Sequence, residues 1–72
     1  MNKQAVERAI AHFGSQTKMG KECGIPQTLI SDTLLGNKRF GAETCLKVAR
    51  ATGGLVKARD LRPDIDWEAS FL

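Results

Sequence analysis

Apolar residues recur near the start of the chain at the spacing of an amphipathic helix. The positions i, i+3, i+4 and i+7 are held by Val6, Ala9, Ile10 and Phe13. This periodicity predicts a helix within residues 1–13 whose apolar stripe faces a core. Asn2 is placed to cap its first turn, and Gly14 is placed to end it.

Residues 16–35 predict two short helices joined by a tight glycine turn. Ser15 can cap the first of these helices as an N-cap residue. Gly20 has no Cβ, so the second helix can cross close to it. Gly24 supplies the positive φ that a sharp turn needs, and Pro26 suits the first turn of the second helix, where its missing N–H costs nothing. This pattern is typical of a helix-turn-helix.

The second helix of this pair, residues 26–35, has two different faces. Ile30 and Leu34 face the core at i, i+4. The opposite face is polar and short and consists of Gln27, Thr28, Ser31 and Asp32. Such a face suits a helix that enters the major groove of DNA. Leu29 and Leu35 stand at partly exposed positions, where packing on another helix is favoured over contact with a thymine methyl.

Two further helical segments are expected. Residues 42–52 repeat the apolar stripe and end at a glycine pair, and residues 58–61 form a helical turn that a proline stops. Phe40 is expected to anchor the core before them. A strand at 55–57 has no second strand-like run to pair with, so the pattern favours an all-helical fold.

Two segments resemble known DNA-binding proteins. QTKMGKECGIPQTLIS, residues 16–31, resembles the recognition unit of the Cro repressors of lambdoid phages, and ATGGLVKARDLRPDIDW, residues 51–67, is similar to the end of the YdaS-type Cro-like prophage regulators. The resemblance implies a compact domain of four to five helices of the lambda-repressor-like or Cro type. The chain departs from the family at Thr33, where a large apolar residue is common, and at Gly41, where proline is common.

Length and composition indicate an ordinary small globular protein. The 72 residues are expected to form one domain that buries roughly 60% of its unfolded surface, so dimerisation would help its stability. Residues are 42% hydrophobic, with no apolar run that predicts a membrane span and no signal peptide, so we expect a location in the bacterial cytoplasm, at the nucleoid when bound to DNA.

Charge is distributed unevenly along the chain. Through Arg59 there are ten Lys and Arg against four acids, whereas from Asp60 onward Arg62 stands among four acids. The net charge of the whole chain is +3. The basic part would be drawn toward phosphates, and the acidic tail from about residue 60 would be turned away from them. In that tail Trp67 is expected to pack within its own chain, and Phe71 and Leu72 have no predicted role.

The polar face of residues 26–35 supplies the candidate base contacts. Gln27 can pair with adenine N6 and N7, and Thr28 and Ser31 can bond base edges or phosphate. Asp32 is repelled by phosphate unless it accepts from cytosine N4 or pairs with a lysine or arginine. Two groups of residues are the candidate phosphate contacts. The first is at the start of the helix expected from residue 16 and consists of Gln16, Thr17 and Lys18. The second is in the loop after the helix of residues 26–35 and consists of Asn37, Lys38 and Arg39.

Metal and enzyme chemistry are not favoured. Cys23 and Cys45 fall on apolar faces of two different predicted helices, so they are expected to be reduced core residues. His12 is the one histidine and no CxxC pair occurs, which argues against a zinc site. We expect no cofactor, no small-molecule ligand and no catalytic residue, since no nucleophile stands with a base and no phosphate loop occurs.

Two functional hypotheses follow. The first is a Cro-like transcriptional repressor of phage or prophage origin that binds a pseudo-palindromic double-stranded operator as a weak homodimer, formed or strengthened on DNA. The second is a protein-interaction module, such as a member of a toxin and antitoxin pair, built on the same fold. Sharp sequence preference in DNA binding would favour the first, and a tight protein complex that survives loss of Gln27 would favour the second.

Overall fold

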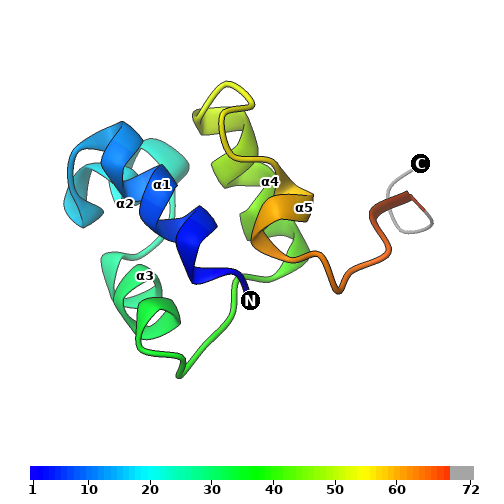
Figure 1. Ribbon diagram of the computed structural model, residues 1–72. Coiled ribbons are helices and arrows are strands. Elements are labelled where there is room, and N and C mark those ends of the chain that lie inside the picture. The colour runs from blue at the N-terminus through cyan, green and yellow to red at the C-terminus, as the bar shows by residue number, and fades with distance from the viewer. Residues whose placement is uncertain (69–72) are drawn as a thin grey trace.

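The computed structural model describes residues 1–68, which form five helices (Figure 1). In chain order they are α1 (Lys3–Phe13), α2 (Gln16–Cys23), α3 (Gln27–Leu34), α4 (Ala42–Ala51) and α5 (Ala58–Leu61). No strand occurs in this part of the chain, and residues 55–57 form a loop. The predicted all-helical fold is therefore confirmed. The tail residues Phe71 and Leu72 lie outside the described residues.

The helix ends follow from the capping residues that the sequence supplies. The Asn2 side chain accepts hydrogen bonds from the backbone N–H groups of Gln4 and Ala5 at 3.1 and 3.4 Å. The Ser15 hydroxyl accepts one from the N–H of Lys18 at 3.1 Å. Gly14 ends α1 in the left-handed region at φ 99°. These caps confirm the predicted boundaries of α1 and the predicted start of α2.

Three predicted boundaries shift by one residue. Pro26 precedes α3 as its N-cap with φ −65°, so the helix begins at Gln27 and ends at Leu34. Helix α4 ends at Ala51 with Thr52 as its C-cap, and the next residue, Gly53, adopts the left-handed conformation at φ 64°, through which an α-helix does not continue. These shifts leave the predicted faces of the helices unchanged.

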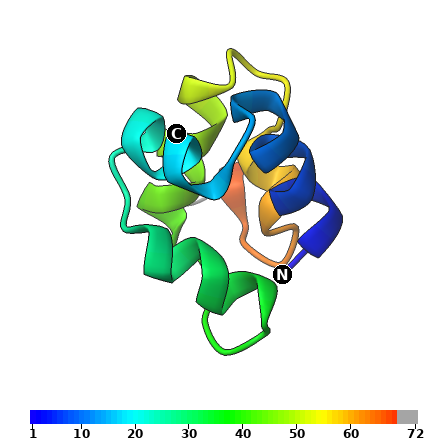
Figure 2. The ribbon, with the colours of Figure 1, turned by 90° about the vertical axis from the view of Figure 1, so that its left-hand side faces the viewer.

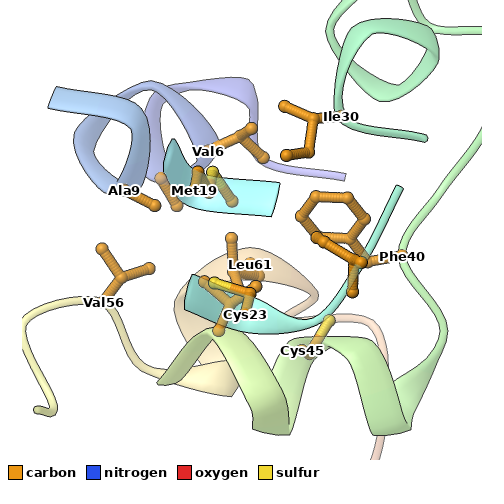
Figure 3. Close-up of a cluster of buried hydrophobic side chains, with 12 residues drawn as sticks. Val6, Ala9, Met19, Cys23, Ile30, Phe40, Cys45, Val56 and Leu61 are labelled. Atoms are coloured by element: carbon orange, nitrogen blue, oxygen red, sulfur yellow. The ribbon is translucent and has the colours of Figure 1, made fainter. Parts of the chain in front are cut away.

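One cluster of apolar side chains fills the space between the helices (Figure 3). Its buried members come from all five helices and the loops between them: Ala5, Val6, Ala9, Met19, Cys23, Ile25, Ile30, Phe40, Cys45, Val48, Val56 and Leu61. Helix α1 packs against α2, α3 and α5, and α4 packs against α2 and α5. Phe40 is fully buried, as predicted, and is among the largest side chains of the core.

Leu29 and Leu35 differ in their environment. Leu29 packs against the core, as expected. Leu35 is 71% exposed, so the expectation that it packs on another helix is wrong within the described chain. The reason is that α3 ends at Leu34 and Gly36 reverses the chain at φ 84°, which leaves Leu35 on the outside of the turn.

Arg62 attaches the C-terminal segment to the core. Its guanidinium donates to the carbonyl of Phe40 at 3.2 Å and pairs with Asp64 at 2.6 Å, and the pKa of the Asp64 carboxyl is lowered by this hydrogen bond. The indole N–H of Trp67 donates to the carbonyl of Arg62 at 2.8 Å, and Trp67 packs against the core. The predicted intramolecular packing of Trp67 is confirmed.

Both cysteines are free and buried, as predicted. Burial raises the pKa of the Cys45 thiol from 9.0 to about 11, and burial followed by the charge of Glu22 raises that of Cys23. Neutral thiols of this kind behave as small apolar side chains.

Candidate nucleic-acid interface

Helices α2 and α3 are held at a fixed angle by the turn between them. The N–H of Ile25 donates to the carbonyl of Gly20 at 3.0 Å, and Gly24 adopts φ 69°. A Cβ on Gly20 would lie 2.9 Å from the carbonyl oxygen of Ile25. The predicted close approach at Gly20 is therefore real, and the group that approaches is the backbone that leads into α3. The glycine is required for contact, and its own backbone is helical.

Helix α3 lies at an edge of the molecule in both ribbon views (Figure 2). Ile30 is buried on its inner side together with Thr33. On the outer side Gln27 and Thr28 are exposed, and Ser31 is half-buried. The four candidate base-contacting residues thus stand on the accessible side of α3, with half-buried Asp32 at the border of this face.

Two hydrogen bonds join this face to the start of α2. The Ser31 hydroxyl donates to Oε1 of Gln16 at 2.7 Å. The Thr17 hydroxyl donates to Oε1 of Gln27 at 3.2 Å. Each bond links a candidate phosphate contact on α2 to a candidate base contact on α3. Members of the two predicted groups therefore lie side by side on one polar surface, which we call the α2–α3 face and define as Gln16, Thr17, Gln27, Thr28 and Ser31.

The bond to Thr17 leaves Gln27 able to contact a base on two atoms. A carbonyl oxygen has two lone pairs, and Thr17 occupies one of them. The other lone pair and the amide N–H₂ remain for an adenine, which offers one donor and one acceptor in the major groove. The contact with Thr17 thus fixes the direction of the side chain without using up its pairing groups.

The loop after α3 is exposed and basic, but one of its cations is already paired. Asn37, Lys38 and Arg39 are all exposed. The N–H groups of Asn37 and Lys38 donate to the carbonyl of Asp32 at 2.9 and 3.3 Å, and Nζ of Lys38 lies 3.7 Å from the Asp32 carboxylate. Asp32 therefore has a cationic partner, which is one of the two arrangements in which a carboxylate can stand beside DNA phosphates.

Sequence reasoning did not identify the contacts within this surface. Gln16 and Ser31 are fifteen positions apart, and Thr17 and Gln27 are ten apart. Only the angle between α2 and α3 makes them neighbours. Lys18, the third predicted phosphate contact on α2, is exposed. Its side chain makes no hydrogen bond among residues 1–68, and its backbone N–H donates to the Ser15 hydroxyl.

A surface hollow of the described chain lies elsewhere. It has a volume of about 360 Å³ and lies between α5 and the segment that follows it. Three acidic residues line it, Asp60, Asp66 and Glu68. Carboxylates repel phosphate, so this hollow does not extend the α2–α3 face. In residues 1–68 no helix has the length and apolar character needed to span a bilayer.

Comparison with known proteins gives two matches to the chain. The family model described as "Bacterial toxin YdaS" matches residues 6–70. The Escherichia coli (strain K12) protein named "Putative transcriptional regulator YdaS" is 36% identical over 61 residues, which cover 85% of this chain and 62% of the relative. The chain thus spans less than two thirds of that relative's length. No solved structure matches the chain.

Proposed function

We propose that this chain, which belongs to the family described as bacterial toxin YdaS, is a transcriptional regulator that binds double-stranded DNA through α3. The observation that carries the proposal is the α2–α3 face, where exposed and half-buried amide and hydroxyl groups of two helices are joined by hydrogen bonds. Fixed side chains of this kind read base edges at low entropic cost. The name of the Escherichia coli relative supports the regulatory role.

In this proposal the pair α2–α3 acts as a helix-turn-helix. Helix α3 enters the major groove with Gln27 and Thr28 foremost, while Gln16 at the start of α2 contacts a phosphate. Lys38 and Arg39 contact flanking phosphates and add affinity without sequence preference. The protein acts as a Cro-like repressor that occupies a promoter, needs no cofactor and catalyses no reaction.

A dimer on the operator is part of the same proposal. Two copies would place their α3 helices in successive major grooves about 34 Å apart, on a site whose halves are related by approximate two-fold symmetry. A chain of this size makes few base contacts alone, and a second half-site multiplies its affinity. Weak pairing of the free protein is sufficient for this purpose.

The test compares Gln27→Ala with Gln4→Ala. Gln4 is an exposed glutamine on α1, outside the α2–α3 face, and serves as the matched control. Sites are first selected from random duplex DNA with the unmodified chain, and affinities are then measured by gel shift. We expect Gln27→Ala to lose about 1–3 kcal/mol of specific binding and to relax preference at one base pair. Equal effects of the two substitutions would contradict the proposal.

A second candidate function is a protein partner in a toxin and antitoxin pair. The description of the matching family favours it, and so do two large apolar side chains on the surface, Leu35 and Leu55, at 71% and 55% exposure. This function predicts a protein complex that persists in Gln27→Ala and is lost in Leu35→Ser or Leu55→Ser. The DNA-binding function predicts instead that Gln27→Ala lowers gel-shift affinity for DNA more than Leu35→Ser or Leu55→Ser does.

A further inference from the structure

We propose that Gln16 is a positioning residue that makes Ser31 select adenine or cytosine at one position of the bound DNA. The inference rests on the proposed function and adds to it the class of base that one side chain reads. It starts from the hydrogen bond between Ser31 Oγ and Gln16 Oε1, which at 2.7 Å is the shortest contact of the α2–α3 face.

The direction of this bond is fixed by chemistry. An amide oxygen carries no hydrogen, so the hydroxyl hydrogen of Ser31 must point toward Gln16. A serine hydroxyl has one hydrogen and two lone pairs. Both side chains are half-buried, which restricts water from competing for the bond. The side of the Ser31 oxygen that faces outward therefore offers lone pairs only.

A hydroxyl that can only accept has few partners on DNA. Phosphate oxygens, guanine O6 and N7, and thymine O4 are all acceptors and give it no bond. The donors in the major groove are the amino groups of adenine N6 and cytosine N4. Ser31 should thus favour a base with an amino group over one with a carbonyl, and it should contact a base and not a phosphate.

The same bond orients Gln16. Its oxygen is directed to Ser31, so its N–H₂ group is left to donate. A donor is what a phosphate contact requires, in agreement with the role proposed for this residue. Thr28 provides the contrast, because its exposed hydroxyl makes no hydrogen bond among residues 1–68 and is free to donate or accept.

The experiment is site selection from a random duplex DNA library with the full chain and four variants. The variants are Ser31→Ala, Gln16→Ala, Gln16→Glu and Thr28→Ala, each first checked for folding by thermal unfolding. In the unmodified chain we expect one position to favour adenine or cytosine by about two- to tenfold, the range of one net hydrogen bond. Ser31→Ala should remove this preference, and Thr28→Ala should leave it in place.

The two substitutions of Gln16 separate positioning from simple loss of affinity. Gln16→Ala frees the Ser31 hydroxyl to donate, so guanine and thymine should be accepted at the same position. Gln16→Glu keeps an acceptor oxygen for Ser31 and should keep the base preference, although its charge weakens binding to all sequences. Base frequencies, and not affinity, are therefore the measurement that decides.

The outcomes are distinguishable. An enriched site in which the Ser31-dependent position favours guanine or thymine overturns the inference alone. So does an unchanged base preference at every position in Ser31→Ala or in Gln16→Ala. A chain that enriches no sequence overturns the proposed function and the inference with it.

Discussion

Two buried threonines differ in what their hydroxyl groups contact. The Thr52 hydroxyl oxygen lies 3.0 Å from the carbonyl oxygen of Ala49 and 3.3 Å from that of Val56, so its one hydrogen is shared between these two acceptors, and it accepts from the N–H of Val56 at 3.2 Å. The Thr33 hydroxyl is buried and has no hydrogen-bond partner among residues 1–68. A buried polar group without a partner lowers stability, because it has lost its bonds to water.

We predict that Thr33→Val raises the free energy of unfolding. A methyl group replaces the hydroxyl at nearly the same size, so the gain should be about 1 kcal/mol. The matched substitution Thr52→Val should instead cost about 1–3 kcal/mol, because it leaves the N–H of Val56 without its partner. Urea unfolding measures the change in the free energy of unfolding for each variant. A change of the same sign in both variants would contradict the prediction.

The Cys45 thiol predicts a loss of stability at high pH. Its pKa is about 11 in the folded chain, against 9.0 ordinarily, so the folded state holds the proton more tightly than the unfolded state. Stability should be complete below pH 9, fall between pH 9 and 11, and level off above. The loss should total about 2–3 kcal/mol.

The control for this titration is Cys45→Ala. Other groups that titrate in the same range, such as lysine side chains, are common to both proteins. We expect urea unfolding between pH 8 and 11 to give a smaller decline in the variant, although the variant is less stable at pH 8 because it leaves a cavity. Parallel declines would show that the buried thiol does not account for the pH dependence.

At the scale of elements, the angle between α2 and α3 depends on Gly20. We predict that Gly20→Ala destabilises the chain and weakens DNA binding more than its stability loss explains. The new Cβ would lie 2.9 Å from the Ile25 carbonyl, a backbone group that moves only with the turn. Overpacking costs typically about 1–3 kcal/mol, which exceeds the gain of about 1 kcal/mol from replacing glycine in a helix.

Gly41→Ala is the matched control for this substitution. A Cβ on Gly41 meets nothing within 4 Å, and its φ of −70° suits any residue. Thermal unfolding and gel shift should therefore separate the two alanine variants. If Gly20→Ala were as stable as Gly41→Ala, the close contact would not determine the angle.

The helices could be predicted from the sequence because their causes are local. The apolar period of α1, its cap at Asn2 and its end at Gly14 all lie within the same fourteen residues. The bond between Gln16 and Ser31 could not be predicted, because it depends on how α2 and α3 are packed. The exposure of Leu35 was also missed, since helix periodicity does not tell where the last turn ends.

At the scale of the whole molecule, the acidic segment lies away from α3. Figure 1 shows the segment that follows α5, in orange to red, on the side of the molecule opposite α3. Two of its carboxylates have local partners, since Asp60 accepts from the N–H of Lys57 and Asp64 pairs with Arg62. The separation of a basic body from an acidic tail could be predicted from the order of charges along the chain. The pairing of Lys38 with Asp32 could not, because it depends on how the loop folds back on α3.

The pairing of Lys38 with Asp32 predicts that Lys38 and Arg39, the two cations after α3, contribute unequally to DNA binding. We expect Arg39→Ala to reduce the slope of log affinity against log salt by about one unit, because an exposed cation that contacts a phosphate releases about one counterion. Lys38→Ala should reduce the slope by less, because Asp32 already balances part of its charge. Asp32→Asn should then raise affinity for non-specific DNA, since it frees Lys38 and removes a repelled carboxylate.

Lys57→Ala is the control for these measurements. Lys57 is exposed at the start of α5, which packs on α1 and α4, so its removal changes net charge equally without touching the loop after α3. Affinity for one duplex is measured across a range of salt concentrations for each variant. A slope that falls equally in Arg39→Ala and Lys57→Ala would mean that overall charge, and not the loop after α3, accounts for the attraction to phosphate. A larger fall in Arg39→Ala would place a phosphate contact in the loop after α3, in agreement with the proposed function.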